Sequence, residues 1–215
     1  MYGALNQAVL ARVPSTANRV LDLGCGTGVL GRALKERQPC AVVGVTFSPE
    51  EAAAARAHLD QVLVRDLNRF EPGEVGRVDC VICSHVLEHL YHPDQLLRQL
   101  HACLAAEGRV VVALPNVLFW RQRLEFCLGR FRYAEGGLMD RTHYRFFDWE
   151  TAGALLAQTG YGVESAEAEG ALPGSRFLAQ AGRWLDQRAL ELSPGLFGFQ
   201  FIFVARPAAT QPASG

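Results

Sequence analysis

The sequence lacks a strong excess of either charge. Its 21 lysine and arginine residues nearly balance 22 aspartate and glutamate residues, so the formal net charge is -1 at pH 7. Proteins that bind nucleic acid through bulk electrostatics carry a basic excess, so we expect no nucleic-acid partner. The sequence also has no apolar run of the ~18 residues that a spanning helix needs. The N-terminus lacks the basic start and long apolar core of a signal peptide. We therefore expect no membrane span and a cytoplasmic location.

Internal repeats and a domain-scale linker are absent as well. At 215 residues the chain has the length of one domain and can bury a sizeable core. Its hydrophobic share of 49% and charged share of 20% are typical of globular proteins. We predict a single domain over residues 1–206 and a disordered tail of small residues over 207–215.

The chain contains six cysteines, and two of them form a C-x-x-C pattern at Cys80 and Cys83. Such a pattern can indicate a redox or zinc site. Residues 78–84 read as a strand, however, and within a strand these two side chains point to opposite faces. We therefore predict that both are small buried hydrophobic residues.

Apolar strand patterns alternate with helical patterns along most of the chain. The predicted strands cover residues 19–23, 41–46, 61–65, 78–84, 109–114, 161–168 and 198–205. The predicted helices cover residues 3–12, 29–37, 93–107, 117–129, 149–158 and part of 173–192, with a further helix opening at Ser48-Pro49. This alternation predicts an α/β fold with a mostly parallel sheet and helices on both faces.

The chain is organised around a glycine turn between the first strand and the helix that follows it. Gly24, Gly26 and Gly28 follow the strand at a spacing of two, and a helical pattern begins at Val29. This order places backbone N–H groups and a helix N-terminus against a bound ligand, and glycine leaves room for close approach. Asp22 at the strand's end can face a cationic group of that ligand.

The glycine pattern of this turn is compatible with two different cofactors. Residues 26–31 match the dinucleotide fingerprint G-x-G-x-x-G, which favours a NAD-dependent oxidoreductase of Rossmann type. That fingerprint should start where the strand ends, but Gly24 and Cys25 intervene. The series acid-x-Gly-x-Gly-x-Gly, which starts at Asp22, resembles motif I of class I S-adenosylmethionine-dependent methyltransferases. A partner protein that binds this cofactor without catalysis is a third possibility.

The resemblance extends from residue 19 to residue 206. It implies a Rossmann-like, seven-stranded, mostly parallel sheet whose last strand is antiparallel and lies between the fifth and sixth strands. The stretches PNVLFWRQRLEFCLGRF, MDRTHYRFFDWE and FGFQFIFVARP look like a bacterial small-molecule subgroup, similar to type 11 and type 23 methyltransferase domains. This implies S-adenosyl-L-methionine as cofactor, and a small-molecule or glycan/lipid-precursor acceptor. We expect a monomer or a homodimer.

Position by position, the resemblance assigns the cofactor site to three strand ends and to the segment after the fourth strand. At the end of the second strand the family usually has an acid that binds the ribose, but this chain has Thr46; Glu51 from the next helix could share that role. Glu51 could also be only a first-turn acid, and Asp66 only a turn residue. The expected cofactor-binding residues are Asp22, Gly24, Cys25, Gly26, Gly28, Thr46, Phe47, Glu51, Asp66, Leu67, Ser84 and His85.

A possible metal site follows the fourth strand. His85, Glu88 and His89 would share one face of a helix. Related ubiquinone-pathway O-methyltransferases have an acid at the first of these positions, followed by the same Leu-Glu-His, and can hold a divalent metal there. Because that leading acid is missing, we predict no metal; Glu88 and His89 would instead orient the loop beneath the cofactor and substrate.

Residues 117–147 are the predicted substrate or lid insertion, because binding residues tend to lie on loops of a rigid scaffold. We expect methyl transfer to a hydroxyl, with His143 as the base and His85 as the second candidate. Arginines in this insertion could grip a carboxylate or phosphate, or could form a solvated face. The candidate substrate-binding residues are Arg121, Arg141, Tyr144 and Arg145.

Overall fold

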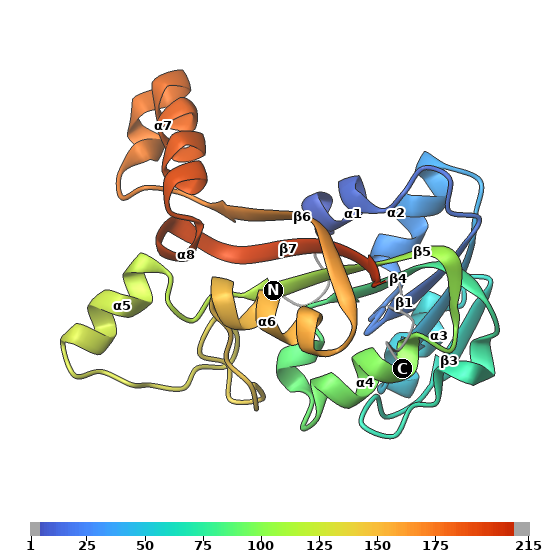
Figure 1. Ribbon diagram of the computed structural model, residues 1–215. Coiled ribbons are helices and arrows are strands. Elements are labelled where there is room, and N and C mark those ends of the chain that lie inside the picture. Colours follow the sequence, from blue (N-terminus) through green and yellow to red (C-terminus); the bar gives the residue numbers. More distant parts are fainter. Residues whose placement is uncertain (1–4, 209–215) are drawn as a thin grey trace, which may run out of the picture.

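A computed structural model describes residues 5–208 of the chain. A seven-stranded sheet with the order β3-β2-β1-β4-β5-β7-β6 runs through it (Figure 1). Its strands are β1 (Arg19–Leu23), β2 (Ala41–Thr46), β3 (Gln61–Val64), β4 (Val78–Ser84), β5 (Leu104–Pro115), β6 (Tyr161–Gly170) and β7 (Gly198–Pro207). Strands β1 to β5 are parallel, and β7 is antiparallel to both β5 and β6. The predicted Rossmann-like methyltransferase topology is confirmed.

Each face of the sheet carries its own hydrophobic core. Helices α1 (Gln7–Arg12), α2 (Val29–Arg37) and α3 (Pro49–Ala55) cover one face, and α4 (Pro93–Leu100) and α6 (Trp149–Gln158) cover the other. The strands alternate between the two cores with a period of two. Cys80 lies in the first core and Cys83 in the second, and both are free thiols. The prediction for the C-x-x-C pattern is therefore confirmed.

Side-chain caps fix where two of these helices begin. The Ser48 hydroxyl accepts a hydrogen bond from the Glu51 N–H at 3.2 Å, and Pro49 occupies the first turn of α3. Asp148 and Thr151 form a reciprocal capping box at the start of α6. Local sequence therefore determines these helix starts, as the predictions assumed.

Two long connections extend beyond the sheet. The first, between β5 and α6, contains α5 (Trp120–Cys127) and a segment with no further helix or strand. The second, between β6 and β7, contains the short helix η3 (Ser175–Leu178), α7 (Ala179–Leu192) and α8 (Pro194–Phe197). Figure 1 shows α5 and α7 projecting on the same side of the molecule. Within the described residues, no helix has the length and apolar character that a membrane crossing requires.

The structure corrects several predicted boundaries. Helix α4 ends at Leu100 and β5 begins at Leu104, not at residue 109, because Leu104 pairs with Val78 of β4. Helix α5 is shorter than predicted, since the Val117 N–H instead donates to the Phe147 carbonyl at 3.0 Å. Both corrections come from partners distant in sequence, which a local pattern does not reveal.

The two ends of the chain were also assigned from sequence. The predicted first helix begins at Gln7, and its expected first residues, 3 and 4, lie outside the described residues. Strand β7 runs to Pro207, one residue into the predicted tail. Residue 208 is also described, whereas residues 209–215 of that tail lie outside the described residues.

Gly44 in the middle of β2 offers a test of the packing beneath the glycine turn. A Cβ added there would lie 2.5 Å from Leu59 Cδ1 and 2.7 Å from Cys25 Sγ. We expect Gly44→Ala to lower the free energy of unfolding by about 1–3 kcal/mol, the usual cost of overpacking. Gly162→Ala on β6 is the matched control, because nothing lies within 4 Å of its added Cβ. Equal urea midpoints for the two variants would contradict this account of the core.

Candidate active site

The glycine turn lies at the carboxyl end of β1 and leads into α2. Gly24, Gly26 and Gly28 have φ values of 70°, 53° and 81°, a region that glycine reaches without steric cost. The Cys25 N–H donates to the Val45 carbonyl at 3.0 Å, which anchors the turn to β2. A Cβ added at Gly24 would lie 2.6 Å from Val86 Cγ2. The turn therefore packs directly against the segment that follows β4.

Asp22 is a buried acid just before this turn, with 2% of the residue exposed. Its Oδ2 atom has no hydrogen-bond partner among the described residues. Burial raises the pKa of Asp22 to about 7, because no counter-charge offsets the lost hydration. A buried carboxylate oxygen without a partner is costly, so this position suits a cationic ligand group.

The end of β2 and the start of α3 meet above the same turn. The Thr46 hydroxyl donates to Glu51 Oε2 at 2.6 Å. Glu51 Oε1 lies 4.0 Å from the position that a Cβ on Gly26 would take. A hydroxyl and a carboxylate therefore lie together beside the glycine turn. Phe47, next in the chain, is 76% exposed and can cover a flat group.

Asp66 and Leu67 follow β3, next to these residues at the same edge of the sheet. Asp66 Oδ1 accepts hydrogen bonds from the Asn68 N–H at 2.9 Å and from the Asn68 side-chain amide at 3.1 Å. This is the turn role considered from the sequence. It occupies one carboxylate oxygen and leaves the Oδ2 atom for another donor. Leu67 is half-buried beside it.

Ser84 and His85 close this edge at the end of β4. With φ of 55°, His85 is the single non-glycine residue with positive φ in the described part of the chain. Its ring nitrogens lie 2.8 Å from Gln200 Oε1 and 3.3 Å from Glu88 Oε1, and 36% of the side chain is exposed. Burial lowers the pKa of His85, but the hydrogen bond and charge of Glu88 outweigh it, so the net pKa is raised.

His143 lies in the segment packed on η2 (Leu87–His89). The Tyr144 and Arg145 N–H groups both donate to the Glu88 carbonyl, at 2.8 and 3.0 Å. His143 is 8% exposed, and its ring centroid lies 4.7 Å from that of His89. Burial lowers the pKa of His143. Glu88, His89 and His143 place one potential metal-ligand atom each within 4.8 Å of one another.

The four candidate substrate-binding residues do not form one cluster. Arg121 lies on α5, while Arg141 pairs with Glu135 at 2.9 Å. The Arg145 guanidinium donates to the Tyr91 carbonyl at 2.7 Å, and Tyr144 packs its ring 4.4 Å from that of Tyr91. Tyr144 and Arg145 are therefore fixed near η2, whereas the charges of Arg121 and Arg141 are on the outer surface.

Sequence reasoning did not identify Gln200, which is 4% exposed on β7. Besides contacting His85, its Oε1 accepts from the Asn6 side-chain amide at 3.2 Å, and its amide nitrogen donates to Glu169. No local pattern around residue 200 signals these contacts. They depend on the pairing of β7 with β5 and β6, which sets Gln200 opposite Pro115 and Glu169.

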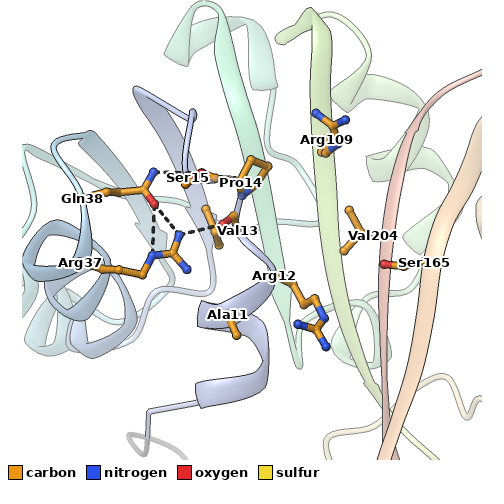
Figure 2. Close-up of a pocket in the computed structure, with 10 residues that line it drawn as sticks. All are labelled: Ala11, Arg12, Val13, Pro14, Ser15, Arg37, Gln38, Arg109, Ser165 and Val204. Atoms are coloured by element: carbon orange, nitrogen blue, oxygen red, sulfur yellow. Dashed lines mark hydrogen bonds between the residues drawn. The ribbon is translucent and has the colours of Figure 1, made fainter.

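A cavity of about 530 Å³ lies at the opposite, amino edge of the sheet (Figure 2). Three arginines line it, but each already has a partner. Arg109 pairs with Glu164 at 2.6 Å, Arg12 pairs with Glu167, and Arg37 donates to the Val13 carbonyl at 2.8 Å. These contacts connect α1, α2 and the sheet, so we assign the cavity no part in the chemistry.

Comparison with known proteins decides between the possible cofactors. A family described as "methyltransferase domain" matches residues 3–166. The chain belongs to this methyltransferase family. This membership makes S-adenosylmethionine the cofactor and decides against the NAD-dependent alternative.

Two curated relatives of this methyltransferase are named for ubiquinone biosynthesis and for trans-aconitate. It is 29% identical over 123 residues to a ubiquinone biosynthesis O-methyltransferase of Psychrobacter arcticus, covering 54% of this chain and 48% of that protein. It is 38% identical over 117 residues to a trans-aconitate 2-methyltransferase of Methylobacterium nodulans, covering 51% and 43%. The chain thus spans about half the length of the curated relatives it matches.

Solved structures share the whole fold. A S-adenosylmethionine-dependent methyltransferase from Archaeoglobus fulgidus has a TM-score of 0.65 at 20% identity, and the match covers 93% of each chain. Magnesium protoporphyrin IX methyltransferase from Synechocystis, with bound S-adenosylhomocysteine, has a TM-score of 0.63 at 16% identity. That second match covers 94% of this chain and 81% of the Synechocystis chain. At these identities the likeness concerns the fold.

We expect cofactor binding to depend on pH if Asp22 contacts the cofactor's ammonium group, because burial raises the pKa of this carboxyl group. Its pKa of about 7 means that the carboxyl group is mostly protonated below pH 7, and the neutral form cannot attract the cofactor's ammonium group. As pH falls from 7 toward about 5.5, we expect the affinity for S-adenosylhomocysteine to fall, approaching tenfold per pH unit. Calorimetry measures this slope, and Asp22→Asn should bind more weakly with no slope. A wild-type affinity that stays constant over this range would contradict the role of Asp22.

Proposed function

We propose that this methyltransferase transfers the methyl group of S-adenosylmethionine to an oxygen atom of a small acceptor molecule. When bound, the cofactor supplies an electrophilic methyl group on a sulfonium. The acceptor oxygen forms a bond to that carbon in line with the carbon–sulfur bond that breaks. The protein's task is therefore to align the two reactants and to deal with the proton or charge on the oxygen.

The cofactor site that we propose follows the three strand ends. Asp22 would pair with the ammonium group, and the backbone of Gly24 and Gly26 would lie along the amino-acid half. The Thr46–Glu51 pair, hydrogen-bonded at 2.6 Å, would bind the ribose hydroxyls. Asp66 and Leu67, which follow β3, would contact the adenine. The remaining residues of the proposed cofactor site are Cys25, Gly28, Phe47 and Ser84.

The backbone conformation of His85 is the observation that best supports a role in binding the acceptor. A left-handed φ costs a histidine conformational energy, and such strain concentrates at functional sites. Leu23 pairs with Cys83, and a Cβ on Gly24 would lie 2.6 Å from Val86 Cγ2, so His85 lies beside the glycine turn. Its half-exposed ring is the polar group best placed to meet an acceptor oxygen there.

We assign to His85 the contact with the acceptor oxygen. Glu88 Oε1 and Gln200 Oε1 orient its ring, and because both oxygens accept, both ring nitrogens donate in this arrangement. Uptake of a proton from a hydroxyl would therefore require the acceptor oxygen to replace Gln200 Oε1 beside a neutral Nε2, while Nδ1–H stays on Glu88. His143, our first candidate from the sequence, is only 8% exposed and lies against Glu88 and His89. The proposal therefore favours the second sequence candidate.

The acceptor that we propose is a small molecule or a glycan or lipid precursor with a hydroxyl or carboxylate oxygen. Two relatives, a ubiquinone biosynthesis O-methyltransferase and a trans-aconitate 2-methyltransferase, support such a class. Residues 117–147 would enclose it. Their exposed arginines, Arg121 and Arg141, suit negative charge at the rim, with Tyr144 and Arg145 nearer to η2. Either a monomer or a homodimer is compatible with this arrangement.

The test begins with a screen of labelled methyl transfer across phenols, carboxylic acids, sugars and lipid precursors. With the acceptor found, His85→Ala should lower kcat by roughly 10²–10⁴-fold, the usual contribution of a positioned base. Its affinity for S-adenosylhomocysteine should stay close to that of the wild type. His92→Ala, which removes an exposed histidine at the start of α4, is the control. If His85→Ala retains near-full kcat while His143→Ala does not, the assignment reverts to His143.

A further inference from the structure

A compact group of three ligating side chains lies where η2 meets the segment of residues 138–145. Glu88 and His89 come from η2, and His143 comes from the segment packed on it. Their potential ligand atoms all lie within 4.8 Å of one another. His85 is not a member of this group, because its ring nitrogens face Gln200 and Glu88. The group therefore differs from the i, i+3, i+4 set that the sequence spacing suggested.

Glu88 has the feature that most needs explanation. Its side chain is completely buried, and its Oε1 atom faces His85. Its Oε2 atom has no hydrogen-bond partner among the described residues. Leaving a buried carboxylate oxygen without a partner costs free energy. A bound cation would supply the missing partner, as buried charges in proteins are paired or coordinate metals.

The two histidines are oriented as metal ligands usually are. His89 Nδ1 lies 3.1 Å from the Thr142 carbonyl, and His143 Nδ1 lies 3.3 Å from the Leu138 carbonyl. A carbonyl only accepts, so Nδ1 donates in both rings, and Nε2 carries the lone pair of each neutral imidazole. This backbone-carbonyl partner on the far nitrogen is the common support of metal-binding histidines.

We propose that Glu88, His89 and His143 bind one divalent transition-metal ion of the zinc class. Two imidazole nitrogens and one carboxylate suit zinc and its neighbours, whereas magnesium and calcium prefer oxygen ligands. Bonds of ~2.1 Å in a tetrahedral array hold ligand atoms about 3.4 Å apart. From separations of at most 4.8 Å, each pair therefore has to close by no more than about 1.4 Å. Three protein ligands leave a coordination position that water can fill.

Such an ion would link the segment of residues 138–145 to η2. The segment between α5 and α6 contains no helix or strand. Its described attachments to η2 include the Tyr144 and Arg145 N–H bonds to the Glu88 carbonyl. A metal bond from His143 to Glu88 and His89 would add a strong link at the same point. The proposed ion thus orders the segment and is not required to touch the reacting atoms.

The experiment titrates zinc into chelator-treated, metal-free protein. Calorimetry should give about one tight site per chain in the wild type. Glu88→Gln and His143→Ala should each weaken binding by at least the ~100-fold that loss of even a supporting partner can cost. His92→Ala and Cys127→Ser are the controls, because both remove an exposed ligand outside the group. Glu88→Gln keeps the side-chain shape, and circular dichroism confirms that each variant is folded.

Hydrogen exchange supplies a readout that is independent of activity. Zinc should slow amide exchange across residues 138–145 in the wild type and in both controls, but not in Glu88→Gln or His143→Ala. Zinc bound equally well by all five proteins would overturn the proposal, as would the absence of any tight site. Weakening by Cys127→Ser or His92→Ala alone would assign the ion to the surface and equally overturn it.

Discussion

The parallel pairing of β1 with β4 is the constraint on which the site depends. It sets Leu23 opposite Cys83, so the glycine turn and the segment from His85 onward leave the sheet at the same edge. The contact between Gly24 and Val86 shows how closely the two segments approach. In open α/β sheets, ligands bind outside the carboxyl ends of the strands. Here one side of that edge suits a cofactor, and the other side suits its reaction partner.

Two buried acids at this edge are left incompletely satisfied. Among the side chains that the structure describes, Asp22 Oδ2 and Glu88 Oε2 are the buried polar atoms without a hydrogen-bond partner. Elsewhere in this fold such atoms are paired: Asn116, for example, donates to the Gly195 and Gly198 carbonyls. A cation would supply the missing partner of each atom: the ammonium group of the proposed cofactor at Asp22, and the proposed metal ion at Glu88. Without these ligands, the fold bears the free-energy cost of two buried, unpartnered carboxylate oxygens.

The polar groups at the two edges of the sheet therefore differ in how completely they are paired. At the amino edge, the arginines around the cavity pair with Glu164 and Glu167 or donate to the Val13 carbonyl. Their charges therefore stabilise the packing of α1 and α2. At the carboxyl edge, Asp22 Oδ2 and Glu88 Oε2 are left without a hydrogen-bond partner among the described residues. The antiparallel strand β7 contributes to this edge from the far end of the chain, because its pairing with β5 carries Gln200 to His85.

The sequence by itself determined the element order, the glycine turn and the family, because strand periodicity, glycine spacing and helix caps are local. It also placed Cys80 and Cys83 on opposite faces, since the period of a strand is two. Only the tertiary structure brought His143 to Glu88, Gln200 to His85 and Leu104 into β5. These contacts join residues far apart in sequence, and strand register and loop packing set them. No pattern within a short window carries that information.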